Sequence, residues 1–130
     1  MTEDLRQLVE YRLGQAAETL DAARDLQGQG HLRDSINRAY YAMFYAGLGL
    51  LATRMLGSSK HAGVLSLFGQ HFVKTGAFSV DAGRYLREAF DMRQKCDYCE
   101  FFDPEPEQAR ELIEHAEEFL AEARRVWSGL

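Results

Sequence analysis

The sequence predicts an all-α protein: an up-and-down antiparallel bundle of four long helices and one shorter helix, which we expect to form a dimer. Four long segments repeat apolar residues at steps of three and four, and no segment alternates apolar and polar residues as a strand does. The segments are joined by short connections, which favour antiparallel neighbours. Because there is no repeat, low-complexity tract or linker, we expect a single domain over residues 1–130.

The composition is that of a folded domain of ordinary size. Of the 130 residues, 46% are hydrophobic and 12% are aromatic, which excludes a disordered chain. No apolar run approaches the ~18–20 residues that span a bilayer, and residues 1–5 lack the features of a signal peptide. We therefore expect a cytoplasmic protein without a membrane partner. The net charge of −5 argues against general attraction to nucleic acid, but it allows a local basic site.

The first two predicted helices differ in their apolar pattern. The first has one apolar face and ends at residues 27–30, where two glycines form a helix stop and a turn. The second covers about residues 31–56 and has no charged residue between Ala39 and Ala52. A helix that is apolar nearly all round is either central in its bundle or buried against another chain, and we expect both here.

The remaining helices are predicted from their boundaries. Residues 57–59 interrupt the second helix and begin a shorter one that ends at Gly76. Ser79 or Asp81 can cap the following helix by accepting hydrogen bonds from free amides of its first turn. Residues 103–107 (DPEPE) combine an acidic cap with proline in the first turn, so they begin the last helix.

Arg93 is the first candidate for a functional residue. Its spacing from Leu86 and Ala89 places it on or beside the core-facing stripe of its helix, where an unpaired guanidinium is costly. Such an arginine needs a carboxylate, a subunit interface or an anionic ligand. Asp97 lies one turn further on and can supply the carboxylate. Arg93 is therefore either the partner of Asp97 in a structural ion pair or part of a phosphate site.

A second candidate site lies on the second helix. Arg38, Tyr41 and Tyr45 fall on one strip of basic and aromatic character, because they are spaced at three and four residues. A guanidinium beside aromatic rings suits a phosphate next to a stacked base. The alternative is that both tyrosines are core or dimer-interface rings.

A third candidate is the helix start at Ser59, Lys60 and His61. Free amides and the helix dipole favour an anion there, although the Gly-rich stretch of a P-loop is missing. The alternative is that a serine simply caps the helix.

The sequence predicts neither a metal site nor a cofactor. The four histidines show no metal-ligand spacing. Cys96 and Cys99 form a single CxxC pair at the C-terminal end of a predicted helix, whereas redox pairs of this type draw a lowered thiol pKa from a helix N-terminus.

Four runs of sequence together resemble the HEPN domain family: NRAYYAMF at 37–44, SKH at 59–61, FGQHFVKT at 68–75 and RQKCDY at 93–98. The resemblance covers nearly the whole chain, and the first and last runs are fairly specific in combination. It implies an up-and-down helical bundle that dimerises and places the arginine sites of two subunits near one cleft.

The resemblance also implies a class of function. HEPN proteins are often encoded beside a minimal nucleotidyltransferase, as the toxin half of a toxin–antitoxin pair. Many are metal-independent endoribonucleases that use an arginine followed a few residues later by histidine, and some are silenced when the partner transfers AMP to a nearby tyrosine. Here Arg93 matches the motif arginine, but residues 98–100 are Tyr-Cys-Glu and contain no histidine.

Three functional hypotheses follow. The leading one is a HEPN-type dimer that binds a nucleotide or RNA and acts with a minimal nucleotidyltransferase in a toxin–antitoxin-like pair, without the usual Arg/His ribonuclease site. The second is an endoribonuclease toxin that uses Arg93 with Asp97 or Tyr98 in place of histidine. The third is a purely structural dimeric adaptor.

Overall fold

The structure, a computed structural model, describes residues 1–130 and consists of helices joined by short connections. The helices are α1 (Glu3–Gly28), α2 (Leu32–Ala52), α3 (His61–Phe68), α4 (Val80–Tyr98) and α5 (Pro106–Ser128), and a π-helical turn, η1 (Gly69–Val73), continues α3. The predicted all-α fold of four long helices and one shorter helix is thereby confirmed. None of the helices combines the length and the apolar character needed to cross a membrane.

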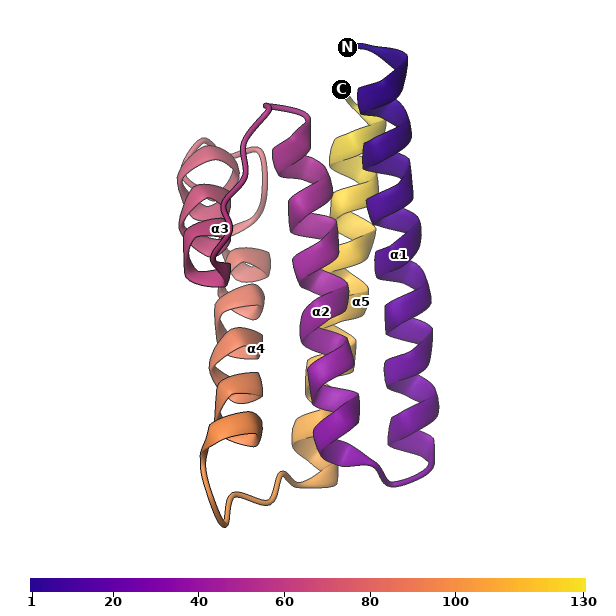
Figure 1. Ribbon diagram of the computed structural model, residues 1–130, viewed down its shortest axis with the longest axis vertical. Helices are drawn as coiled ribbons and strands as arrows, with labels where there is room; N and C mark the ends of the chain where they lie inside the picture. The colour runs from indigo at the N-terminus through magenta and orange to yellow at the C-terminus, as the bar shows by residue number, and fades with distance from the viewer.

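The four long helices alternate in direction along one axis (Figure 1). The chain descends through α1, rises through α2, descends through α4 and rises through α5, so that both termini lie at the same end of the bundle. The short helix α3 lies beside the C-terminal half of α2, while α4 covers the N-terminal half. This arrangement brings the start of α3 near the middle of α2.

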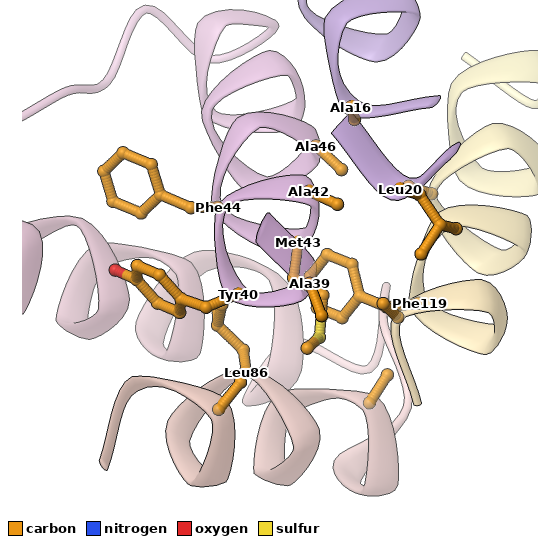
Figure 2. Packing of buried hydrophobic residues seen from close by; sticks show 14 of the residues in the cluster. Ala16, Leu20, Ala39, Tyr40, Ala42, Met43, Phe44, Ala46, Leu86 and Phe119 are labelled. Carbon is orange, nitrogen blue, oxygen red and sulfur yellow. The ribbon is translucent and has the colours of Figure 1, made fainter. Parts of the chain in front are cut away.

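Helix α2 occupies the centre of the bundle, as expected from its apolar surface. Thirteen of its 21 residues are buried, and it packs against α1, α3, α4 and α5. Small residues at Ala39, Ala42 and Ala46 face α1 and the side of α5, which allows close approach of the neighbouring helices (Figure 2). At Gly49 an added Cβ would lie 3.4 Å from Arg12 Cβ, so the two backbones are close there as well.

The end of α2 differs from the prediction, because the helix stops at Ala52 and not near Leu56. Met55 adopts a left-handed conformation with φ of 56°. The amide of Leu56 donates to the carbonyl of Leu51, and the amide of Met55 donates to that of Ala52, each at 3.0 Å. This is the hydrogen-bond pattern of a Schellman helix end. Met55 and Leu56 continue the apolar spacing of the helix, and the first glycine after them is Gly57. The sequence pattern therefore predicted a later helix end.

The caps of the last helices follow the sequence, but that of α3 does not. Ser79 Oγ accepts from the Ala82 amide at 3.1 Å and is the cap of α4. Glu105 and Gln108 form a capping box at the start of α5. At α3 the serine cap that was given as the alternative to an anion site is not formed: Lys60 stands at the cap position without a side-chain bond, and Ser58 Oγ accepts from the Lys60 amide before the helix begins.

Two phenylalanines offer a matched test of the core. Phe119 is fully buried between the rings of Phe68 and Phe78, at centroid distances of 5.5 and 4.9 Å, whereas Phe101 is 97% exposed. Phe119→Ala should lower the free energy of unfolding by about 3–5 kcal/mol in urea titration, because it leaves a cavity. Phe101→Ala should change it by less than about 0.5 kcal/mol. Equal losses in the two variants would contradict this packing.

Candidate functional site

Arg93 lies on the face of α4 that packs against α2. Leu86 and Ala89, two turns and one turn earlier, are buried in the core, and the Arg93 side chain is itself only 16% exposed. Its guanidinium carbon is 5.7 Å from the ring centroid of Tyr40 and 5.5 Å from that of Tyr41. Nη2 also donates to the Tyr41 hydroxyl at 3.4 Å. The Arg93 guanidinium therefore makes cation–π contacts with both tyrosine rings of α2.

Asp97 is the carboxylate partner of Arg93. Its Oδ2 is 3.0 Å from Arg93 Nε, one helical turn away, and the aspartate side chain is 33% exposed. The N–H of Nε is not aimed at an acceptor, so the contact is an ion pair without a directed hydrogen bond. The structure thus contains the ion pair considered from the sequence, but one carboxylate does not satisfy all the donors of the guanidinium.

Arg38 approaches Tyr41 as well. Its guanidinium carbon is 5.0 Å from the Tyr41 centroid, and its Nε and Nη2 donate to the neutral Asn37 side chain at 3.1 and 2.8 Å. Tyr45 extends the aromatic row, with its ring 5.7 Å from that of Tyr41. Two guanidinium groups therefore contact one ring, and Asp97 is the single carboxylate that pairs with either of them. This face carries local positive charge in a chain whose net charge is −5.

His61, the first residue of α3, completes the cluster. Its Nδ1 is 2.9 Å from the Tyr40 hydroxyl. Its ring stacks on Phe44 at 4.2 Å and meets the ring of Tyr41 edge-on at 5.5 Å. Burial lowers the pKa of His61, and the positive charge of Arg93 lowers it further. The imidazole is therefore neutral at physiological pH.

Tyr40 is the buried partner of this histidine. Its side chain is fully inaccessible, and burial raises the pKa of its hydroxyl far above the usual range, although the Arg93 charge acts in the opposite direction. The phenol stays protonated at physiological pH. Tyr40 and His61 therefore form a neutral hydrogen-bonded pair beside a charged guanidinium.

The candidate residues from the sequence fall into two groups in the structure, one clustered and one exposed outside the cluster. One cluster, called here the α2–α4 site, contains six of the proposed residues together with Tyr40: Arg38, Tyr40, Tyr41, Tyr45, His61, Arg93 and Asp97. Ser59 and Lys60 are exposed and contact none of these side chains through a hydrogen bond or an ion pair. Tyr98 is 74% exposed and makes no hydrogen bond with Arg93.

Sequence reasoning missed Tyr40 and the pairing of His61 with the arginine site. The search for a histidine followed the helix of Arg93, whereas the histidine beside Arg93 comes from the start of α3. The adjacent tyrosines at 40 and 41 gave a usable signal, since consecutive helical residues point about 100° apart and can contact two elements. No group of three or more His, Cys, Asp or Glu side chains is placed to hold a metal ion.

The fold and the site define a helical-bundle protein with a basic, aromatic face, and comparison with known sequences gives the family. A HEPN domain model matches residues 9–126. A UPF0332 protein of Thermotoga maritima is 39% identical over 113 residues, which cover 87% of this chain and 86% of the relative. A Methanocaldococcus jannaschii protein named "Putative toxin" is 34% identical over 126 residues, covering 97% and 93% of the two chains. The chain belongs to the HEPN domain family.

The titration of His61 tests the geometry of the site. Arg93→Met removes the positive charge and keeps an apolar stem, so the pKa of His61 should rise. It should nevertheless stay below the ordinary value of 6.5, because burial is the larger cause. Arg87→Met, on the same helix but outside the site, should leave it unchanged. An NMR titration of the imidazole C–H signals measures both. A His61 pKa indifferent to Arg93→Met would contradict the arrangement.

Proposed function

We propose that this chain binds the phosphates of RNA or of a nucleotide at the α2–α4 site. In this proposal it is the toxin-type member of a toxin–antitoxin-like pair whose other member is a minimal nucleotidyltransferase. The observation that carries the proposal is the pair of guanidinium groups, Arg38 and Arg93, on the ring of Tyr41. Arginine is the side chain best suited to phosphate, since its planar fork donates two parallel hydrogen bonds.

The surroundings of the two arginines support a nucleic-acid ligand over a simple anion. Arg38 has no carboxylate partner, so its charge is available to a phosphate without breaking an ion pair. Tyr41 and Tyr45 are half-buried rings beside that charge, and aromatic faces bind bases by stacking. A phosphate flanked by bases satisfies both features, whereas an isolated anion uses only the first.

The relatives support the toxin part of the proposal. Two Methanocaldococcus jannaschii proteins that carry the name "Putative toxin" align with 97% and 94% of this chain. The nucleotidyltransferase partner follows from the common arrangement of HEPN genes. A homodimer is also part of the proposal, because the resemblance to HEPN domains implies a bundle that dimerises. A light-scattering mass of a single chain would remove the dimer from it.

An endoribonuclease is the second candidate, and the proximity of Asp97 to Arg93 favours it. A carboxylate oxygen 3.0 Å from Arg93 Nε would stand next to a phosphodiester bound by the other donors of the guanidinium. Aspartate has an ordinary pKa of ~3.9 and is a weak base near neutral pH. Tyr98 is less suited to the role, since its exposed side chain does not meet the guanidinium. The third hypothesis, a purely structural dimeric adaptor, is the alternative against which RNA or nucleotide binding and RNA cleavage are tested.

Binding of single-stranded RNA tests the proposal directly. Fluorescence anisotropy with a labelled RNA of mixed sequence should show salt-dependent binding by the wild-type chain. Arg38→Ala and Arg93→Ala should each weaken it and lower the slope of log Kobs against log salt by about 0.7, the value for one lost contact to a single-stranded phosphate.

Arg84→Ala is the matched control, because Arg84 lies on α4 in exposed ion pairs with Asp81 and Glu88, at 3.4 and 3.3 Å. It should leave the affinity and the salt slope unchanged. Calorimetry with ATP and AMP distinguishes a nucleotide site from an RNA site. Failure of the wild-type chain to bind RNA, ATP or AMP would favour the adaptor and overturn the proposal.

Expression of the chain tests its role in a pair. Induced synthesis should slow bacterial growth, and Arg93→Ala should relieve this effect while the protein level stays the same. If the adjacent reading frame encodes a small nucleotidyltransferase, its co-expression should also restore growth. Growth that is slowed equally by the wild-type and Arg93→Ala chains would show that the α2–α4 site has no part in toxicity.

A further inference from the structure

We propose that a groove between α3–η1 and the first half of α4 binds an acidic amphipathic segment of a partner protein. The groove, called here the α3–α4 groove, lies where α3 and η1 meet α4 and has a volume of about 280 Å³ (Figure 1). Its lining includes the buried apolar side chains of Leu65, Phe68 and Leu86, so its floor is apolar. It shares no residue with the α2–α4 site, so the inference goes beyond RNA binding and does not depend on it.

Two glycines give the groove its shape. Gly83 on α4 allows η1 to approach closely, because an added Cβ there would lie 2.7 Å from Val73 Cγ2. Gly69, the first residue of η1, lines the groove and leaves space instead, since an added Cβ there would have no atom within 4 Å. The chain thus brings the two walls together at one point and leaves apolar space unfilled at another. Single π-helical turns such as η1 are rare and are frequently found at functional sites.

The groove suits the apolar side chains of a protein segment better than a small molecule. Val80 at the start of α4 lines the groove and is 73% exposed, so the apolar surface continues out to solvent. The volume is below the ~300–1,000 Å³ of most small-molecule sites. An amphipathic helix that lays one or two apolar anchors into the groove would cover this surface.

The wall formed by α3 and η1 comes from a stretch of the chain without acidic residues. No aspartate or glutamate occurs between Asp34 and Asp81, whereas this stretch contains four arginine and lysine residues. Negative charge is therefore confined to the other parts of a chain whose net charge is −5. Lys74, directly after η1, is exposed and forms no ion pair. Its ammonium group is available to a carboxylate of a partner.

Arg87 supplies the free charge on the α4 wall. It lines the groove, is exposed and forms no ion pair within the chain. Arg84, one turn earlier, pairs with both Asp81 and Glu88, so its charge is already compensated. Opposite charges across an interface fix its register and speed association. RNA is less suited to the groove, because its single aromatic ring, that of Phe68, is only 1% exposed and cannot stack on a base.

Selection from a random-peptide phage library tests the proposal without a known partner. Peptides enriched on the wild-type chain should combine Asp or Glu with apolar residues at steps of three and four. The same phage should not bind Gly69→Trp, because the indole fills the groove. Gly14→Trp is the matched control: an added Cβ at Gly14 also has no atom within 4 Å, and α1 makes no contact with α3, η1 or α4.

A synthetic peptide of the enriched sequence gives the affinities by fluorescence anisotropy. Gly69→Trp should weaken binding by about tenfold or more, because it displaces an apolar anchor. Arg87→Glu should weaken it by about threefold or more, because it replaces an attraction by a repulsion. Arg6→Glu makes the same charge change at an exposed, unpaired arginine of α1 and should leave the affinity unchanged. Thermal unfolding verifies that each variant is folded, and the surface variant Arg87→Glu keeps the test valid if Gly69→Trp does not fold.

The outcomes separate this inference from the proposed function. Failure to enrich any peptide, or enrichment of peptides that lack acidic residues or bind Gly69→Trp as tightly as the wild type, would overturn the inference. Loss of RNA binding in folded Gly69→Trp would also overturn it, because the groove would then belong to the RNA-binding surface. A wild-type chain that binds the peptide but neither RNA nor nucleotide would overturn the proposed function and leave this inference standing.

Discussion

Helix α2 must be covered on every side, and this constraint shapes the whole bundle. One side carries small residues, Ala39, Ala42 and Ala46, that let neighbouring helices approach (Figure 2). The other carries the rings of Tyr40, Tyr41 and Phe44, and Tyr40 meets Phe90 of α4 edge-on. Helices α3 and α4 share this side, with α3 next to one half of α2 and α4 next to the other (Figure 1). The α2–α4 site lies where they meet.

The electrostatics of the site follow from that packing. Burying most of the Arg93 side chain is unfavourable unless its charge is compensated, and a single ion pair with Asp97 does so only in part. The faces of Tyr40 and Tyr41 supply further stabilisation through their π-electrons, at about 0.5–2 kcal/mol per contact. An arginine held in this way keeps its direction and retains unsatisfied donors. Both properties favour a ligand with several acceptor oxygens.

Much of the fold could be predicted from the sequence, because the apolar period of the long helices is decided locally. The central place of α2 followed from its lack of charge, and the start of α5 from the Pro-Glu-Pro pattern. The end of α2 could not be predicted, since Met55 takes a left-handed conformation that glycine usually provides. The candidate site was predicted only in part. The strip of Arg38 and Tyr41 depends on spacing within one helix, but the contact of His61 with Tyr40 joins residues 21 positions apart.

The central claim is that the face shared by α2, α3 and α4 receives the phosphates and bases of RNA. NMR mapping of the wild-type chain titrated with single-stranded RNA measures this most directly. The account predicts the largest shifts in the side-chain signals of Arg38, Tyr41, His61 and Arg93, with little change in the distant contact between Glu10 and Trp127 at the termini. Shifts confined to that distant end, with the α2–α4 site unperturbed, would contradict it.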